Sequence, residues 1–170
     1  MKQNSNSNTA LFLMELIVVI AFFSLVSVVC VRLFVYASQT GTRSVNVGRA
    51  TRAAESLAEI WIFCDGDLDR VTEYYPGQVP DLTGTNPEDG TLTLCYDENW
   101  QILPAGRTAE AAYSIVLTGQ LTTAREVYGA EAGEGQAVTA SILAQSLKKG
   151  TPLGDLHIDH YLGDAKGGAE

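Results

Sequence analysis

Apolar residues form one long run near the N-terminus of the chain, and no polar stripe interrupts it. Between positions 11 and 31, only one of the twenty-one residues is charged. A helix on the surface of a soluble domain normally shows a polar stripe at the 3.6-residue period, and about 20 apolar residues span a bilayer as a helix. The pattern therefore predicts a transmembrane helix over residues 11–36.

The apolar positions take up a helical spacing again further along the chain. They recur every three or four positions, as is typical of an amphipathic helix, at Ala50, Ala54, Leu57, Ala58, Trp61 and Ile62. Glycines at positions 41 and 48, which precede these apolar positions, weaken the helix locally. For residues 37–64 we expect an amphipathic continuation of one long helix, with two helices and a short break as the alternative. Gly66 is the expected stop.

The rest of the chain shows turn-forming residues and then alternating apolar and polar positions. Proline and glycine are frequent between residues 70 and 90, where we expect a loop. Alternation then predicts strands over residues 91–96, 100–103, 113–121, 138–147 and 156–162. Short strands joined by turns indicate an antiparallel sheet, and one apolar sheet face packed on the amphipathic half of the helix gives an α+β fold.

Charge is distributed unevenly along the chain. Five basic and three acidic residues precede Cys64, whereas six basic and seventeen acidic residues follow from there on. Residues 65–170 are therefore predicted to form an acidic, soluble, β-rich head. Such a head repels phosphate backbones, so we expect no direct nucleic-acid binding from it. Four arginines after the apolar run, against one lysine before it, would by the positive-inside rule alone place the head in the cytoplasm.

One acidic residue, Glu15, lies inside the apolar run. It is the only charged residue between Lys2 and Arg32. A charge at the centre of a membrane helix costs about 2.5–3.5 kcal/mol, and less near the helix end. Such a residue is a candidate functional residue by default. The alternative is that Glu15 lies solvated among the lipid headgroups without a specific role.

Residues 10–21 read Ala-Leu-Phe-Leu-Met-Glu-Leu-Ile-Val-Val-Ile-Ala. They resemble the N-terminal signature of type IV pilins and pseudopilins, in which a polar leader and a small residue precede a cleaved bond and an apolar helix. A glutamate stands fifth after the cleavage point. The resemblance covers residues 1–60 and implies a leader peptide over residues 1–10, cleavage between Ala10 and Leu11, methylation of Leu11, and an assembly role for Glu15. Proteins of this kind also have the α+β layout predicted above.

The resemblance implies a structural subunit of a type IV pilus, a competence pseudopilus or a type II secretion-like filament. Its implied partners are a prepilin peptidase, other pilin or pseudopilin subunits, the assembly platform and membrane lipid. The head would lie outside the cytoplasm on a single-pass membrane protein, and on a surface filament after assembly. Ala10 in place of the usual glycine, and the absence of proline before Pro76, favour a minor pilin or a pseudopilin.

Cleavage would give Glu15 a partner. It would free an ammonium group on Leu11, about 6 Å along the helix from Glu15 at a rise of 1.5 Å per residue. In a bundle of identical helices, the ammonium of one subunit can meet the carboxylate of its neighbour. Within a low-dielectric interior such a pair is strong and fixes the register of the helices, although it must offset desolvation.

Two other hypotheses stay open. An uncleaved single-pass membrane protein could carry an acidic extracytoplasmic head that binds a partner. A membrane-anchored enzyme would need a polar pocket, but the chain has no Cys-x-x-Cys, His-Glu-x-x-His or Gly-x-Ser-x-Gly motif, and His157 and His160 would lie on opposite faces of a strand. We therefore expect a non-enzymatic protein without a cofactor.

A cleaved secretory signal is disfavoured as the interpretation of the apolar run, because the run is longer than the 7–15 residues usual in such a signal.

Two further groups in the head are candidate sites. Cys64 and Cys95 could form a disulfide in an oxidising compartment, although Cys95 alternates out of phase with the apolar residues of its strand. Asp65, Asp67 and Asp69 are spaced like the opening of a calcium loop. The chain lacks the glycine and glutamate that an EF-hand needs further on, so a solvated acidic loop is preferred over a calcium site.

Overall fold

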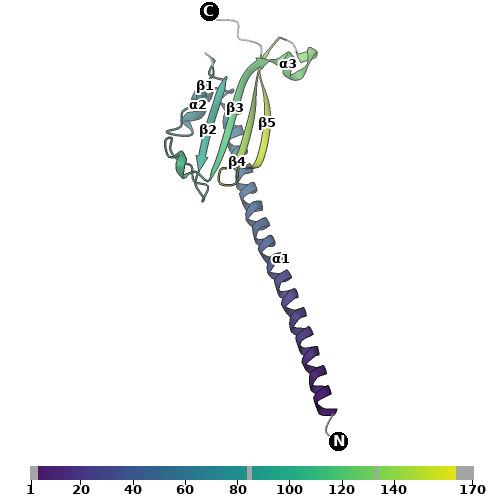
Figure 1. The fold of residues 1–170 in the computed structure, drawn as a ribbon. Coiled ribbons are helices and arrows are strands. Elements are labelled where there is room, and N and C mark those ends of the chain that lie inside the picture. The colour runs from purple at the N-terminus through teal and green to yellow at the C-terminus, as the bar shows by residue number, and fades with distance from the viewer. Residues whose placement is uncertain (1–3, 84–85, 133, 164–170) are drawn as a thin grey trace, which may run out of the picture. The chain divides into compact units, whose positions relative to one another are not determined.

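The computed structural model describes residues 4–83, 86–132 and 134–163. The chain divides into two compact units, Met1–Val45 and Asn46–Glu170, which we describe separately. Helix α1 (Asn4–Phe63) contributes to both. Figure 1 shows it as one uninterrupted ribbon, so the single long helix is confirmed over the alternative of two helices with a break.

The second unit combines the end of α1 with a five-stranded sheet. Its elements after α1 are α2 (Leu68–Glu73), β1 (Asp81–Leu82), β2 (Gly90–Tyr96), η1 (Thr108–Glu110), β3 (Tyr113–Thr123), α3 (Ala124–Tyr128), η2 (Ala130–Ala132), β4 (Gln136–Ser146) and β5 (Thr151–Gly163). The strands follow one another in the order β1-β2-β3-β4-β5, and every neighbouring pair is antiparallel. The predicted α+β fold, with a long helix packed on an antiparallel sheet, is confirmed.

The hydrophobic core lies between the sheet and residues 46–63 of α1, which we call the stem (Figure 1). Leu57 and Trp61 on the stem are fully buried. The apolar face of the sheet meets them with fully buried side chains from three strands: Leu92, Leu94, Ile115, Leu117, Val138 and Ile142. The predicted apolar stripe of the stem is thus confirmed, except that Ile62 remains 37% exposed.

The segment expected to be a loop between residues 70 and 90 contains a short helix and a strand, so that prediction was wrong there. Helix α2 begins because the side chain of Asp67 accepts a hydrogen bond from the backbone N–H of Arg70 at 3.1 Å, which is an N-cap. Leu68 and Val71 then bury their side chains in the core. Strand β1 adds two residues to the edge of the sheet beside β2.

The strand expected over residues 100–103 was also wrong. A single bridge joins Tyr96 and Ile102. The Asp97 carboxylate accepts hydrogen bonds from the backbone N–H groups of Asn99 and Gln101, each at 2.8 Å, and so closes a turn. Trp100 takes the left-handed conformation with φ 64°, which a strand does not tolerate.

Helix α1 ends where Gly66 predicted. The N–H of Gly66 donates to Trp61 O and that of Asp65 to Ile62 O, both at 3.0 Å, which is the pattern of a Schellman motif. Asp65 and Gly66 have φ values of 56° and 85°. A Cβ on Gly66 would lie 2.9 Å from the side chain of Val138, so glycine is required both for the turn and for the approach of β4.

The core between stem and sheet makes Leu57→Ala a test of the fold. We expect this change to lower the free energy of unfolding of the head by about 2–5 kcal/mol, because it removes a fully buried side chain and leaves a cavity. Denaturant unfolding of the full-length protein in detergent measures it. Glu59→Ala, on the exposed side of the same helix, is the control and should change stability by about 0.5 kcal/mol or less. Equal effects of the two changes would contradict this core.

Candidate functional site

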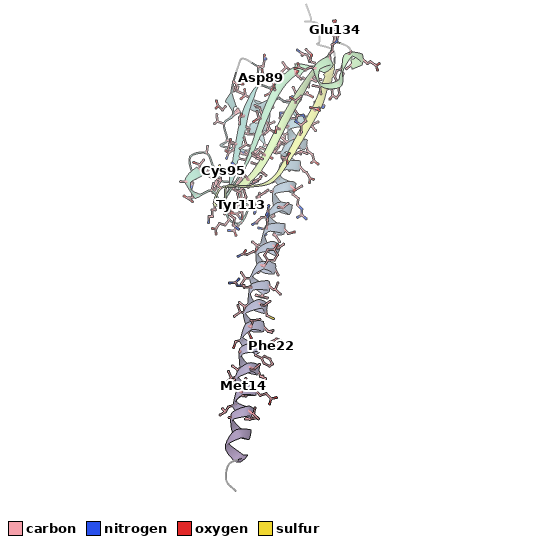
Figure 2. All side chains as sticks on the ribbon, turned by 45° about the vertical axis from the view of Figure 1, so that its right-hand side comes forward. Met14, Phe22, Asp89, Cys95, Tyr113 and Glu134 are labelled. Atoms are coloured by element: carbon pink, nitrogen blue, oxygen red, sulfur yellow. The ribbon has the colours of Figure 1, made fainter. Side chains whose placement is uncertain are left out.

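The first candidate site lies on the apolar surface of α1. Every side chain from residue 10 to residue 45 is exposed. Met14 and Phe22 are 66% and 67% exposed and project outward from the helix (Figure 2). By length and composition, this helix could cross a membrane. Soluble monomers rarely expose apolar patches of more than a few hundred Å², and larger ones are typical of membrane or protein interaction surfaces.

The few polar groups inside the apolar run differ in how they are satisfied. Ser24 donates a hydrogen bond to the carbonyl oxygen of Ile20, and Ser27 to that of Phe23, each at 2.8 Å. Such back-bonding to residue i−4 satisfies the hydroxyl groups within the helix itself. For the Glu15 carboxylate, the residues that the structure describes provide neither a hydrogen bond nor an ion pair. Unlike the two serine hydroxyl groups, the Glu15 carboxylate is thus not satisfied by the described part of the chain.

The structure places the three predicted N-terminal site residues close together on α1. Ala10, Leu11 and Glu15 are all exposed. Leu11 and Glu15 are four residues apart and so lie on the same side of the helix. A cation at position 11 and the carboxylate at position 15 would face the same neighbouring molecule.

Asp65 and Asp67 interact with groups at the end of α1 and the start of α2. The Asp67 side chain caps α2. Asp65 lies 3.9 Å from Arg70 Nη1 through one oxygen and 3.5 Å from His160 Nε2 through the other. Within the described ranges, no three His, Cys, Asp or Glu side chains gather in a way that could hold a metal ion. The solvated acidic loop remains the preferred interpretation of Asp65, Asp67 and Asp69.

Cys64 and Cys95 are both buried and carry free thiols. Cys64 belongs to the core between stem and sheet, whereas Cys95 lies outside that core cluster. Cys95 pairs in register with Ser114 of β3, and its carbonyl oxygen accepts a hydrogen bond from the N–H of Leu103. Burial raises the pKa of both thiols above the usual value. Cys95 alternates out of phase with the apolar residues of β2 that face the stem, which explains why Cys64 and Cys95 do not meet.

The two histidines lie on opposite faces of β5, as their spacing predicted. His160 faces Asp65 at the helix end, and His157 Nε2 lies 3.1 Å from Asp159 Oδ1 on the other face. On that outer face a shallow groove of about 280 Å³ is lined mainly by polar side chains from β3, β4, β5 and α3. Four of these polar side chains already interact with one another in pairs. His157 pairs with Asp159, and Thr122 hydrogen-bonds Glu126 at 2.8 Å.

Comparison of the chain with protein-family models, with curated proteins and with solved structures found no match.

The burial of the two head cysteines predicts a specific pattern of labelling. Iodoacetamide should leave Cys64 and Cys95 unmodified in the native protein, because both thiols are buried and their raised pKa keeps them protonated. In denaturant without reductant, both should react. Peptide mass spectrometry measures this. A peptide pair joined through Cys64 and Cys95, or fast labelling of either in the native state, would contradict the structure.

Proposed function

We propose that this chain is a pilin-like structural subunit, made as a membrane precursor and assembled through its N-terminal helix. One observation carries the proposal: among the described residues, an exposed apolar helix bears a carboxylate without a partner, at the fifth position after a bond that resembles a prepilin cleavage site. A minor pilin or a pseudopilin fits best, since the chain has Ala10 before the bond and no proline in the helix. The assembly would be a pilus, a competence pseudopilus or a secretion filament.

The apolar side chains of residues 11–36 are exposed and need a cover. In the precursor, the surface of residues 11–36 would be covered by lipid, with the head outside the cytoplasm. In a filament, the same surface would be covered by other copies. Such an exchange is possible because apolar helices cover apolar side chains as well as lipid does. The carboxylate of Glu15 distinguishes the two environments. In the filament, the ammonium of a neighbouring processed N-terminus would be its cationic partner.

A second candidate function is a single-pass membrane protein that is never cleaved and whose head binds a partner. The polar groove on the outer face of β3, β4 and β5 supports it, since such a groove could accept a polar ligand. In that case Glu15 would only mark the membrane boundary. The two functions differ in the covalent structure of the N-terminus.

The mature N-terminus is the first test. We expect the protein extracted from membranes of its own cells to begin at a methylated Leu11, since a prepilin peptidase would cut after Ala10 and methylate the new amine. Intact-mass and N-terminal peptide mass spectrometry measure this. As a control, blocking the cut by Ala10→Glu should return a protein that begins at Met1. A wild-type protein that keeps Met1 would refute the proposal and favour the uncleaved membrane protein.

Removal of the Glu15 carboxylate is the second test. Glu15→Ala should enter the membrane as well as the wild type or better, because a charge is removed from the apolar run. Its incorporation into filaments should fall by more than about tenfold, because the ammonium of the neighbouring copy loses its partner. Membrane fractionation and the yield of sheared filaments measure the two effects. Glu131→Ala removes an exposed head carboxylate and is the matched control. Normal incorporation of the Glu15 variant would exclude the pairing role.

A further inference from the structure

The exposed side of the stem carries four charged side chains in a fixed order. Arg49 and Arg52 come first, and Glu55 and Glu59 follow; all four are exposed. Within the described part of the chain, none of the four forms an ion pair or a side-chain hydrogen bond. All four lie outside the buried stripe that carries Leu57, so the sheet does not cover them.

This order does not stabilise the chain's own helix. A helix is stabilised by acidic residues toward its N-terminus and basic residues toward its C-terminus, and Glu placed before a basic residue is the better orientation of a pair. Here both arginines precede both glutamates. Arg49 and Arg52 are like charges three residues apart, and Glu55 and Glu59 are like charges four apart; both pairs are unfavourable within one helix. The one favourable pair is Arg52 with Glu55, three residues apart and in the weaker order. A partner outside the chain would explain the pattern.

The acidic flank of the stem borders a cleft in the head. The cleft, of about 70 Å³, lies between α1 and β5. Ala54, Ala144 and Leu156 give it apolar walls, and the acidic residue Glu55 of the stem lines it as well. An arginine side chain suits such a cleft, because its methylene groups pack on apolar walls while its guanidinium group binds carboxylates.

Arg49 and Glu55 face different flanks of the stem, whereas Arg52 and Glu59, seven residues apart, lie on nearly the same side. At about 100° per residue, Arg49 and Glu55 point roughly 120° apart around the helix axis. A contact between identical copies that joins two different flanks is heterologous, and it repeats from copy to copy as an open assembly. Arg49 on one flank and the cleft beside Glu55 on the other are the two halves of such a contact.

We propose that the cleft between α1 and β5 receives Arg49 of a second copy of this chain, packed parallel to the first and shifted along the helix. The spacing sets the shift: Arg49 precedes Glu55 by six residues, about 9 Å along the helix. The inference rests on the proposed function. The shift has the same direction as the one that brings a Leu11 ammonium to Glu15 of a neighbour, since in every pair the cation comes first in the sequence.

Cysteine cross-linking of full-length chains in membranes of their own cells tests the contact. The variant carries Arg49→Cys and Glu55→Cys, with Cys30→Ala to remove the exposed native thiol. Within one chain the two positions lie about 9–10 Å apart by helix geometry, beyond the ~7 Å that a disulfide bridges. Mild oxidation should therefore link different copies into a ladder of dimers, trimers and longer species. Each single-cysteine variant has one thiol at the contact, so it should give at most dimers.

Charge reversal supplies the second measurement. Arg49→Glu and Glu55→Arg should each lower the yield of assembled multimer by about tenfold or more, because each places like charges together. The double variant, which exchanges the two signs, should recover most of the yield. Arg125→Glu reverses an exposed charge on α3 and should have little effect.

The outcomes separate this inference from the proposed function. Processed wild-type chains that assemble, with double-cysteine variants that give no ladder and reversals that behave like Arg125→Glu, would overturn the contact alone. A ladder between chains together with rescue by the double variant would establish it. Wild-type chains that keep Met1 and stay monomeric would overturn both.

Discussion

The burial of Leu57 and Trp61 against the sheet is the contact on which the rest of the head depends. Without the stem, the sheet would expose an apolar face built from β2, β3 and β4, and a single open sheet does not fold stably with such a face in water. This contact also fixes which side of the stem remains free. Because the apolar stripe turns inward, Arg49 and Glu55 must lie on the exposed flanks.

Periodicity predicted the long elements because their burial alternates regularly. The strands and the stem follow the two-residue and 3.6-residue patterns over many positions, so tertiary packing and local pattern agree. The short elements escaped prediction for a different reason. Helices α2 and α3 depend on single caps, Asp67 and Thr123, which resemble ordinary turn residues in the sequence. Residues 100–103 alternate like a strand, but the Asp97 turn and the stacking of Trp100 on Tyr113 decide their conformation.

The two candidate sites differ in how visible they are in the sequence. Glu15 stands out because a charge in an apolar run is costly, and no tertiary information is needed to notice it. The cleft beside Glu55 could not be predicted, since Asp155, which also lines it, is one hundred positions further along the chain. The two come together because β5 pairs with β4 along its length and so runs beside the stem. Only the register of that pairing determines which residue of β5 faces the cleft.

The charge balance of the chain limits how copies could pack. Six basic and seventeen acidic residues follow from Cys64 on, so two heads repel each other at long range. At physiological ionic strength this repulsion is screened beyond about 8 Å, and only charges near a contact then decide its strength. The stem offers arginines at such a position, facing away from its own core. In the contact proposed above, the placement of Arg49 therefore matters more than the total charge, because Arg49 is the cation that would reach the cleft of the neighbouring copy.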